Sequence, residues 1–231
     1  MSLFAMADFH LSKSIKDKPM DVFGKKWENY MQKIEENCNN ILNQDDVLLI
    51  PGDVSWGTYA SEIKSDLEFI ENLPGKKIIS KGNHDYWWTG AKKLEEMKAE
   101  FGITTVSFLH NNFFSYKDIA ICGNRGWIKS ESEENKKIYA REMIRLELSL
   151  KEAENAGFRK KIVMTHYPPC AGNEKIFDDF LELLLKYNVQ RCIYGHLHNN
   201  FSAAFNGNCA DVRFDLVSAD YLDFKPLLII D

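Results

Sequence analysis

The residues in this chain that could do chemistry occur in five short polar blocks, and each block follows an apolar run of strand length. The blocks combine aspartate, asparagine and histidine, whose oxygen and imidazole nitrogen atoms bind divalent first-row metal ions. Ligands of open α/β folds bind outside the carboxyl ends of the strands, so these side chains are expected to meet at one edge of the fold. The pattern predicts a hydrolytic centre with two metal ions. The blocks are Asp8-Phe9-His10, Gly52-Asp53, Gly82-Asn83-His84-Asp85, Thr165-His166-Tyr167-Pro168 and Gly195-His196-Leu197-His198.

Spacing within the blocks suggests how the ligands are shared. Asp8 and His10 are two residues apart, and such side chains point the same way on an extended backbone, so the pair is expected to chelate one ion. His196 and His198 have the same spacing and are expected to share one face. Asp53 ends an apolar run, and a carboxylate there can bridge two cations and partly cancel their repulsion.

Each block alone is a weak signal, whereas the set is a strong one. Asp-x-His is common, Gly52-Asp53 alone would fit a turn, and a lone histidine such as His166 is usually structural. At average residue usage, Gly-Asn-His-Asp should occur by chance in roughly one in a thousand sequences of this length. Five blocks in one chain, each after a predicted strand, favour a metal centre over a set of structural residues.

In this order the blocks resemble the calcineurin-like metallophosphoesterase superfamily, from residue 8 to residue 198. The resemblance implies an αββα sandwich of two mixed β-sheets flanked by helices, and hydrolysis of a phosphate ester by a metal-bridging hydroxide. Mixed imidazole and oxygen donors accept divalent or mixed-valence Mn, Fe, Zn, Co or Ni, with Mn or Fe favoured. By resemblance, one ion would take Asp8, His10, Asp53 and His198, and the other Asp53, Asn83, His166 and His196.

Two further residues are candidates for contact with substrate. The resemblance implies that His84 meets substrate without binding metal, and a protonated His84 would protonate the leaving oxygen. Many relatives read Gly-Asp-x-x-Asp, and their second aspartate orients this histidine, but Trp56 stands at that place here. Asp85 either replaces that aspartate or is a structural turn residue. Arg125, after another apolar run, either clamps phosphate bidentately or is a surface or salt-bridged arginine.

Aromatic residues follow two of the blocks. Trp56 comes after Asp53, and residues 86–88 (Tyr-Trp-Trp) come directly after Gly-Asn-His-Asp. These rings either wall a pocket for an aryl, base or lipid group or pack in the core. His110, outside every block, is predicted to be a loop histidine.

The remaining pattern predicts one α/β domain over residues 1–231. Short apolar runs bounded by glycine, proline or aspartate fit buried strands, and stripes with steps of three and four fit helices between them. Closely spaced runs at 104–108, 113–116 and 119–123 predict antiparallel pairing, and residues 206–208 (Asn-Gly-Asn) predict a hairpin turn. The other predicted strands are 3–7, 47–51, 77–80, 162–165, 192–195 and 227–230, and the helical stripes are 27–41, 63–70, 139–153 and 177–187.

Composition excludes several classes of protein. The chain has 231 residues, 45% hydrophobic and 27% charged, as globular proteins have. A net charge of −5 argues against a general nucleic-acid or membrane-surface binder. No apolar run approaches the ~20 residues of a membrane span, and no signal peptide is recognisable. Five cysteines without a Cys-x-x-Cys pair suit a reducing compartment, so a cytoplasmic location is expected.

The leading hypothesis is a metal-dependent phosphoesterase acting on a small or extended phosphoester. The sequence leaves open a phosphomonoesterase, a phosphodiesterase, a nucleotide pyrophosphatase and a protein phosphatase, with a slight preference for diesters. Lys81 precedes Gly-Asn-His-Asp where protein phosphatases have arginine, which weakens that alternative. The alternative from another class is a non-catalytic interaction module on the same fold. Such a module should lack some ligands or His84, and this chain retains them all. Nothing in the sequence indicates an oligomeric state.

Overall fold

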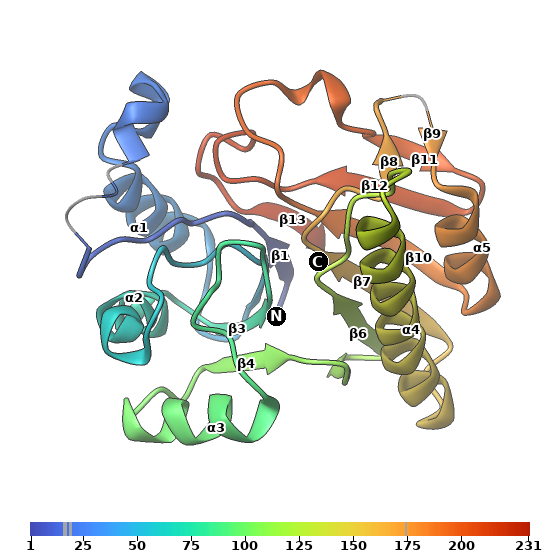
Figure 1. Cartoon of the computed structure of the whole chain (residues 1–231). Helices are drawn as coiled ribbons and strands as arrows, with labels where there is room; N and C mark the ends of the chain where they lie inside the picture. The colour runs from blue at the N-terminus through green and yellow to red at the C-terminus, as the bar shows by residue number, and fades with distance from the viewer. Residues whose placement is uncertain (16–17, 19, 174) are drawn as a thin grey trace.

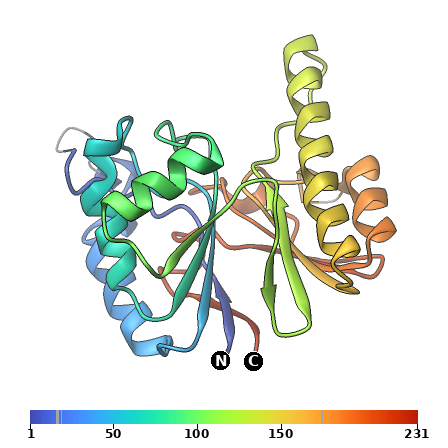
Figure 2. The ribbon, with the colours of Figure 1, turned by 90° about the horizontal axis from the view of Figure 1, so that it is seen from below.

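Two mixed β-sheets stack face to face, and helices cover the outer face of each sheet (Figure 1 and Figure 2). The computed structural model describes residues 1–15, 18, 20–173 and 175–231. This four-layer αββα arrangement confirms the fold class expected from the sequence.

The first sheet has the strand order β13-β1-β2-β3-β4. Four of its strands are parallel and are connected through helices, while the last strand of the chain pairs antiparallel with the first. Its strands are β1 (Leu3–Ala5), β2 (Val47–Pro51), β3 (Lys76–Ser80), β4 (Val106–Leu109) and β13 (Leu227–Ile230). Its helices are α1 (Tyr30–Ile41), α2 (Ala60–Asn72) and α3 (Ala91–Glu100).

The second sheet has the order β11-β12-β10-β7-β6-β5, with four parallel strands between two antiparallel edge strands. Its strands are β5 (Phe114–Tyr116), β6 (Ile119–Asn124), β7 (Lys160–Thr165), β10 (Val189–Tyr194), β11 (Gly207–Cys209) and β12 (Val212–Leu216). The helices α4 (Glu133–Asn155) and α5 (Asp178–Lys186) lie on its outer face. Shorter elements are β8 (Cys170–Ala171), β9 (Lys175–Ile176), and the 3-10 helices η1 (Met20–Phe23), η2 (Lys25–Trp27) and η3 (Phe201–Ala203).

The parallel strands are apolar on both faces because each face is covered. On β2, Leu48 and Ile50 pack under the helices of the first sheet, whereas Val47 and Leu49 face the second sheet. This is the two-residue alternation of a strand, with each parity packing into a separate core. Doubly covered strands explain why the sequence shows continuous apolar runs rather than alternating ones.

Two pairing predictions were wrong. The segment at 104–108 forms β4, which pairs parallel with β3 in the first sheet because α3 returns the chain to that edge. The pairing of β5 with β6 is antiparallel, as predicted. Residues 206–208 are not the hairpin turn, since β11 already begins at Gly207 and the turn lies at Ala210 and Asp211.

The longest helix, α4, has 23 residues and many charges. Among the described residues, no helix is both long enough and apolar enough to cross a membrane. Cys122 and Cys192 are buried in the core beneath α4 and α5.

Candidate metal centre

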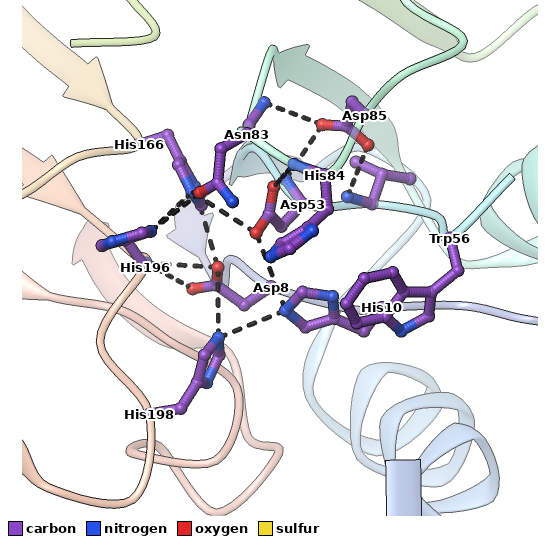
Figure 3. A network of polar contacts seen from close by, with 12 residues as sticks. Asp8, His10, Asp53, Trp56, Asn83, His84, Asp85, His166, His196 and His198 are labelled. Carbon is purple, nitrogen blue, oxygen red and sulfur yellow. Dashed lines mark hydrogen bonds and ion pairs between the residues drawn. The ribbon is translucent and has the colours of Figure 1, made fainter. Parts of the chain in front are cut away.

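The seven predicted ligand residues meet at one edge of the molecule, where strands of both sheets end (Figure 3). The loops that follow the parallel strands of both sheets therefore lie at the same edge, as expected for an α/β fold. Asp8 and His10 follow β1, Asp53 follows β2, Asn83 follows β3, His166 follows β7, and His196 and His198 follow β10.

The ligand atoms form two groups, and within each group they lie within 4.8 Å of one another. In the first group, His10 Nε2 lies 3.2 Å from His198 Nε2. In the second, His196 Nδ1 lies 3.2 Å from His166 Nε2. Imidazole nitrogens that face each other this closely can share a cation as neutral ligands. The first group is Asp8, His10 and His198, and the second is Asp53, His166 and His196.

Asp53 and Asn83 connect these groups. Asp53 Oδ2 lies 3.8 Å from His10 Nε2 and 3.4 Å from His166 Nε2, so this oxygen stands between the two groups. Asn83 Oδ1 lies 2.6 Å from His166 Nε2 and 2.8 Å from His196 Nδ1. The carbonyl oxygen of Asn83 is an acceptor, and the imidazole nitrogens that face it can donate lone pairs. A first-row cation placed among these atoms would be coordinated by all of them. The donor set therefore fits two metal ions.

The charge state of the site favours cations as well. Burial and the positive field of neighbouring histidines lower the pKa of His196 to about 3, so its ring is neutral at pH 7 and can act as a ligand. Burial and repulsion by Asp8 raise the pKa of Asp53. Asp8 and Asp53 are both almost fully buried, and carboxylates in such a place are costly unless positive charge, here from the His198 ring, compensates them. Bound cations would remove that cost.

Hydrogen bonds from outside the groups orient two of the histidines. His166 Nδ1 faces the carbonyl oxygen of Pro51 at 3.0 Å, so Nδ1 carries the proton and Nε2 is directed into the site. His198 Nδ1 lies 2.8 Å from Asp220 Oδ1. Burial opposes protonation of His198, but the carboxylates of Asp8 and Asp220 outweigh it and raise its pKa to about 10.

Asp220 lies outside the five blocks and was not among the expected site residues. The available signal was the same one that marked the five blocks, namely an aspartate directly after the apolar stretch at 216–219. Asp220 stands alone, with no histidine, asparagine or glycine beside it.

The backbone at the ligands differs from the expected extended conformation. Asp8 (φ 62°), His10 (φ 45°), Asp53 (φ 50°) and His196 (φ 73°) all lie in the left-handed region, which is uncommon outside glycine. His196 and His198 therefore do not share a face, and they belong to different groups. Asp8 and His10 do share a group, but through left-handed backbone at both residues and not through strand alternation.

Glycines in the blocks allow the strand-end loops to approach closely. A Cβ atom on Gly82 would lie 2.1 Å from both the backbone nitrogen and Oδ1 of Asp53. A Cβ atom on Gly195 would lie 2.4 Å from Asp8 Oδ2. No larger residue fits at either position without displacing a ligand.

His84 adjoins the ligands without joining either group. Its ring lies 4.4 Å from the ring of Trp56, which in turn stacks on His10 at 4.8 Å and 25°. His84 Nδ1 is buried and has no hydrogen-bond partner among the described residues. Burial lowers the pKa of His84 to about 4, which disfavours the protonated ring that an acid role requires.

Two roles were considered for Asp85, orientation of His84 or a structural role, and its contacts are those of a structural residue. Its carboxylate accepts hydrogen bonds from the backbone N–H groups of Asp53 and Gly82 at 2.9 and 2.8 Å. It also accepts from Val54 N and from the indole Nε1 of Trp87, at 2.9 and 3.1 Å. These bonds fix the loops that carry Asp53 and Asn83 relative to each other, and Asp85 makes no bond to the His84 ring.

Arg125 lies one strand away from the ligands, at the end of β6. Its guanidinium carbon is 4.4 Å from the Trp127 ring, and its Nη2 is 3.7 Å from a carboxylate oxygen of Glu142. Within the described part of the chain its side chain makes no hydrogen bond or ion pair with a ligand residue. Its backbone oxygen accepts the N–H of His166 at 3.0 Å, which places it beside the site.

The aromatic residues after the blocks were expected either to wall a pocket or to pack in the core, and both outcomes occur. Trp87 and Trp88 are buried in the core of the first sheet, whereas Trp56 lines the site. Tyr86 is exposed. His110 is a loop histidine, as predicted, and its Nδ1 accepts a hydrogen bond from Trp88 Nε1 at 3.0 Å.

Comparison with known protein families leads to the same conclusion as the fold and the ligand groups. The family model of the calcineurin-like phosphoesterases matches residues 1–200 of this chain. The chain belongs to this family. It is 26% identical over 175 residues to a probable cyclic nucleotide phosphodiesterase of Coxiella burnetii, a match that covers 72% of this chain and 65% of that protein.

Solved structures share the fold. A calcineurin-like phosphoesterase, YfkN, from Bacillus subtilis is 14% identical with a TM-score of 0.54, covering 95% of this chain and 82% of that one. A phosphopantetheinyl hydrolase from Mycobacterium tuberculosis is 18% identical with a TM-score of 0.51, covering 94% and 88%.

Proposed function

We propose that this chain is a phosphodiesterase that requires two first-row transition metal ions, with Mn or Fe as the native pair. The observation that carries the proposal is the position of Asp53 Oδ2 between two complete ligand groups. We assign Asp8, His10, Asp53 and His198 to one ion, and Asp53, Asn83, His166 and His196 to the other.

The preference for a diester rests on a cavity of about 220 Å³ beside the first ligand group. His10, His84 and His198 form its polar side, and Trp27 and Trp56 are among its apolar walls. A phosphodiester carries a second organic group, and a flat ring would gain contact area against the partly exposed indole of Trp56. The name of the Coxiella burnetii relative supports a nucleotide-like diester.

The residues of the chain have separable roles in this proposal. When bound, the two cations supply positive charge to the phosphoryl oxygens and activate water for attack on phosphorus. Asp8 and Asp53 would hold the cations through their negative charges. His84 lines the cavity assigned to the leaving group, where its ring N–H would donate a hydrogen bond to the leaving oxygen. Trp56 excludes water from that side of the site.

The test uses metal-free protein reconstituted with Mn²⁺ and assayed on bis-p-nitrophenyl phosphate and p-nitrophenyl phosphate. We expect turnover of both compounds, with a higher kcat/KM for the diester. Asp53→Asn should remove the bridging charge, reduce bound metal from two ions toward one, and lower kcat/KM on the order of 10²-fold or more. Asp223→Asn is the matched control, because Asp223 is on the surface with 72% of its side chain exposed.

Two results would contradict the proposal. Protein that holds two ions yet hydrolyses neither ester would indicate a non-catalytic interaction module. Turnover of the monoester alone would show that the apolar cavity does not serve a second ester group.

A further inference from the structure

A second cavity, also of about 220 Å³, lies where β3, β4 and β6 end and is closed on one side by α4. Four basic side chains line it, from Lys81, Arg125, Arg141 and Arg145. Neither the fold nor the predicted metal centre requires basic residues at this place.

The cavity adjoins the candidate metal centre on the side of Asn83 and His166. Lys81 is two residues before Asn83, so the two Cα atoms are at most roughly 7 Å apart. Arg125 is joined to His166 by a backbone hydrogen bond of 3.0 Å. In the first sheet β4 is next to β3, and in the second sheet β6 is next to β7. Since Asn83 follows β3 and His166 follows β7, the cavity extends one strand beyond these two residues in each sheet. The apolar cavity that we assign to the leaving group lies elsewhere, against His10 and His198 of the first ligand group.

The cavity carries an excess of positive charge. Glu142 is the one carboxylate among its lining residues, and four cations against one anion leave three positive charges. Glu142 is buried, and its Oε1 lies 2.6 Å from Arg145 Nη1 and 3.7 Å from Arg125 Nη2, so it holds these two guanidinium groups in place. Burial, followed by the positive charges of Arg145 and Lys81, lowers the pKa of the neighbouring His110.

Two of the cations have no internal partner. Within residues 1–15, 18, 20–173 and 175–231, neither Lys81 nor Arg141 has a carboxylate oxygen within 4.0 Å of its charged nitrogens. Concentrated and unpaired positive charge in a concave site favours binding of an anion, and guanidinium groups match phosphate oxygens in pairs.

We propose that this cavity binds a second phosphoryl group of the substrate, so that preferred substrates carry one phosphodiester at the metal centre and a further phosphate on the arm that enters the basic cavity. This inference rests on the proposed phosphodiesterase function. We match the linker to one nucleoside, because Lys81 in the cavity and Asn83 in the metal centre are only two residues apart in the chain.

The experiment compares two diesters that differ only in that phosphate, the dinucleotide ApA and its 5′-phosphorylated form pApA, with the Mn²⁺ holoenzyme. Since hydrogen bonds to charged groups are strong, we expect kcat/KM for pApA to exceed that for ApA by about tenfold, mainly through KM. Arg141→Ala should reduce this ratio by about fivefold or more. Arg141 makes no ion pair in the described part of the chain, so its removal should not affect folding. Lys151→Ala, which removes a charge from the same helix outside the cavity, should keep the ratio unchanged.

Arg145→Gln provides a second variant and should also reduce the ratio. Equal kcat/KM values for pApA and ApA in the wild-type enzyme would overturn this inference, as would an unchanged ratio in both arginine variants. Failure of the proposed function is distinguishable, because it would abolish turnover of bis-p-nitrophenyl phosphate, which carries no second phosphate. An enzyme that hydrolyses bis-p-nitrophenyl phosphate but shows no preference for pApA retains the proposed function and refutes the basic subsite.

Discussion

Replacement of Gly82 by alanine tests the geometry of the candidate metal centre most directly. Gly82 and Asp53 lie on adjacent loops, and one oxygen of Asp85 accepts hydrogen bonds from the backbone N–H groups of both. The alanine methyl group would lie 2.1 Å from the Asp53 nitrogen and from its Oδ1. Both of these atoms belong to the residue that connects the two ligand groups.

The expected size of the effect follows from this overlap. Carbon and oxygen or nitrogen atoms that are not bonded rarely approach within about 3 Å, so the loops must separate by roughly 1 Å. Overpacking of this kind costs about 1–3 kcal/mol of unfolding free energy. The same displacement moves Asp53 away from one ligand group, and a change of this kind beside a metal ligand lowers metal affinity by about 10- to 100-fold.

Urea unfolding of the metal-free protein measures the first quantity, and competition with a metallochromic chelator measures the second. Gly90→Ala is the control, because a Cβ atom at Gly90 meets nothing within 4 Å. Gly90 precedes α3 at its N-cap, so alanine there should cost about 1 kcal/mol or less and leave metal affinity unchanged. A Gly82→Ala protein with wild-type stability and wild-type metal affinity would show that Asp53 does not lie where the structure places it.

Three further substitutions have defined outcomes. Asp220→Asn should weaken the orientation of His198 and lower metal affinity about tenfold, as measured by the same competition assay. Asp85→Asn places an amide N–H₂ against backbone donors and should cost about 2–3 kcal/mol in urea unfolding, and a smaller loss would contradict its structural role. Burial alone would raise the pKa of Glu71, but hydrogen bonds from two threonines hold it at about 2, below an unfolded value of about 4.3. Its stabilisation is therefore present above pH 4.5 and is lost as pH falls toward 2. Glu71→Ala should lose about 1 kcal/mol at pH 7 and less at pH 3, and a pH-independent difference would refute the assignment.

The sequence was sufficient to predict which polar side chains come together, because each one follows a buried strand. Apolar runs such as the one at 47–51 become doubly covered parallel strands, and the first polar residues after them must lie at the strand ends. The residue types then limit the chemistry, since carboxylate, amide and imidazole groups together indicate metal binding. Asp53 and His166 come from different sheets, and their proximity follows from the αββα arrangement, which the order of the blocks implied through the family resemblance.

The remaining features depend on contacts between segments that are distant in sequence. The left-handed backbone of Asp8 and Asp53 arises where loops of two sheets pack together, and no local pattern specifies it. The placement of β4 depends on which sheet edge is free, and short apolar runs carry no information about that choice. The basic cavity combines Lys81 from one sheet with Arg141 from a helix on the other, so only the assembled fold brings these charges together.

Trp56 shows how a departure from the family pattern changes the site. By the family resemblance, an aspartate at this position would hold the histidine at position 84 by a hydrogen bond, whereas Trp56 places an indole ring against both His84 and His10. A ring in van der Waals contact restricts the imidazole and keeps water away, but it adds no negative charge to favour a protonated His84. The same indole provides an apolar wall of the leaving-group cavity. The substitution therefore exchanges electrostatic support of His84 for an apolar surface, and under the proposed function this surface would stack against the leaving group of a diester.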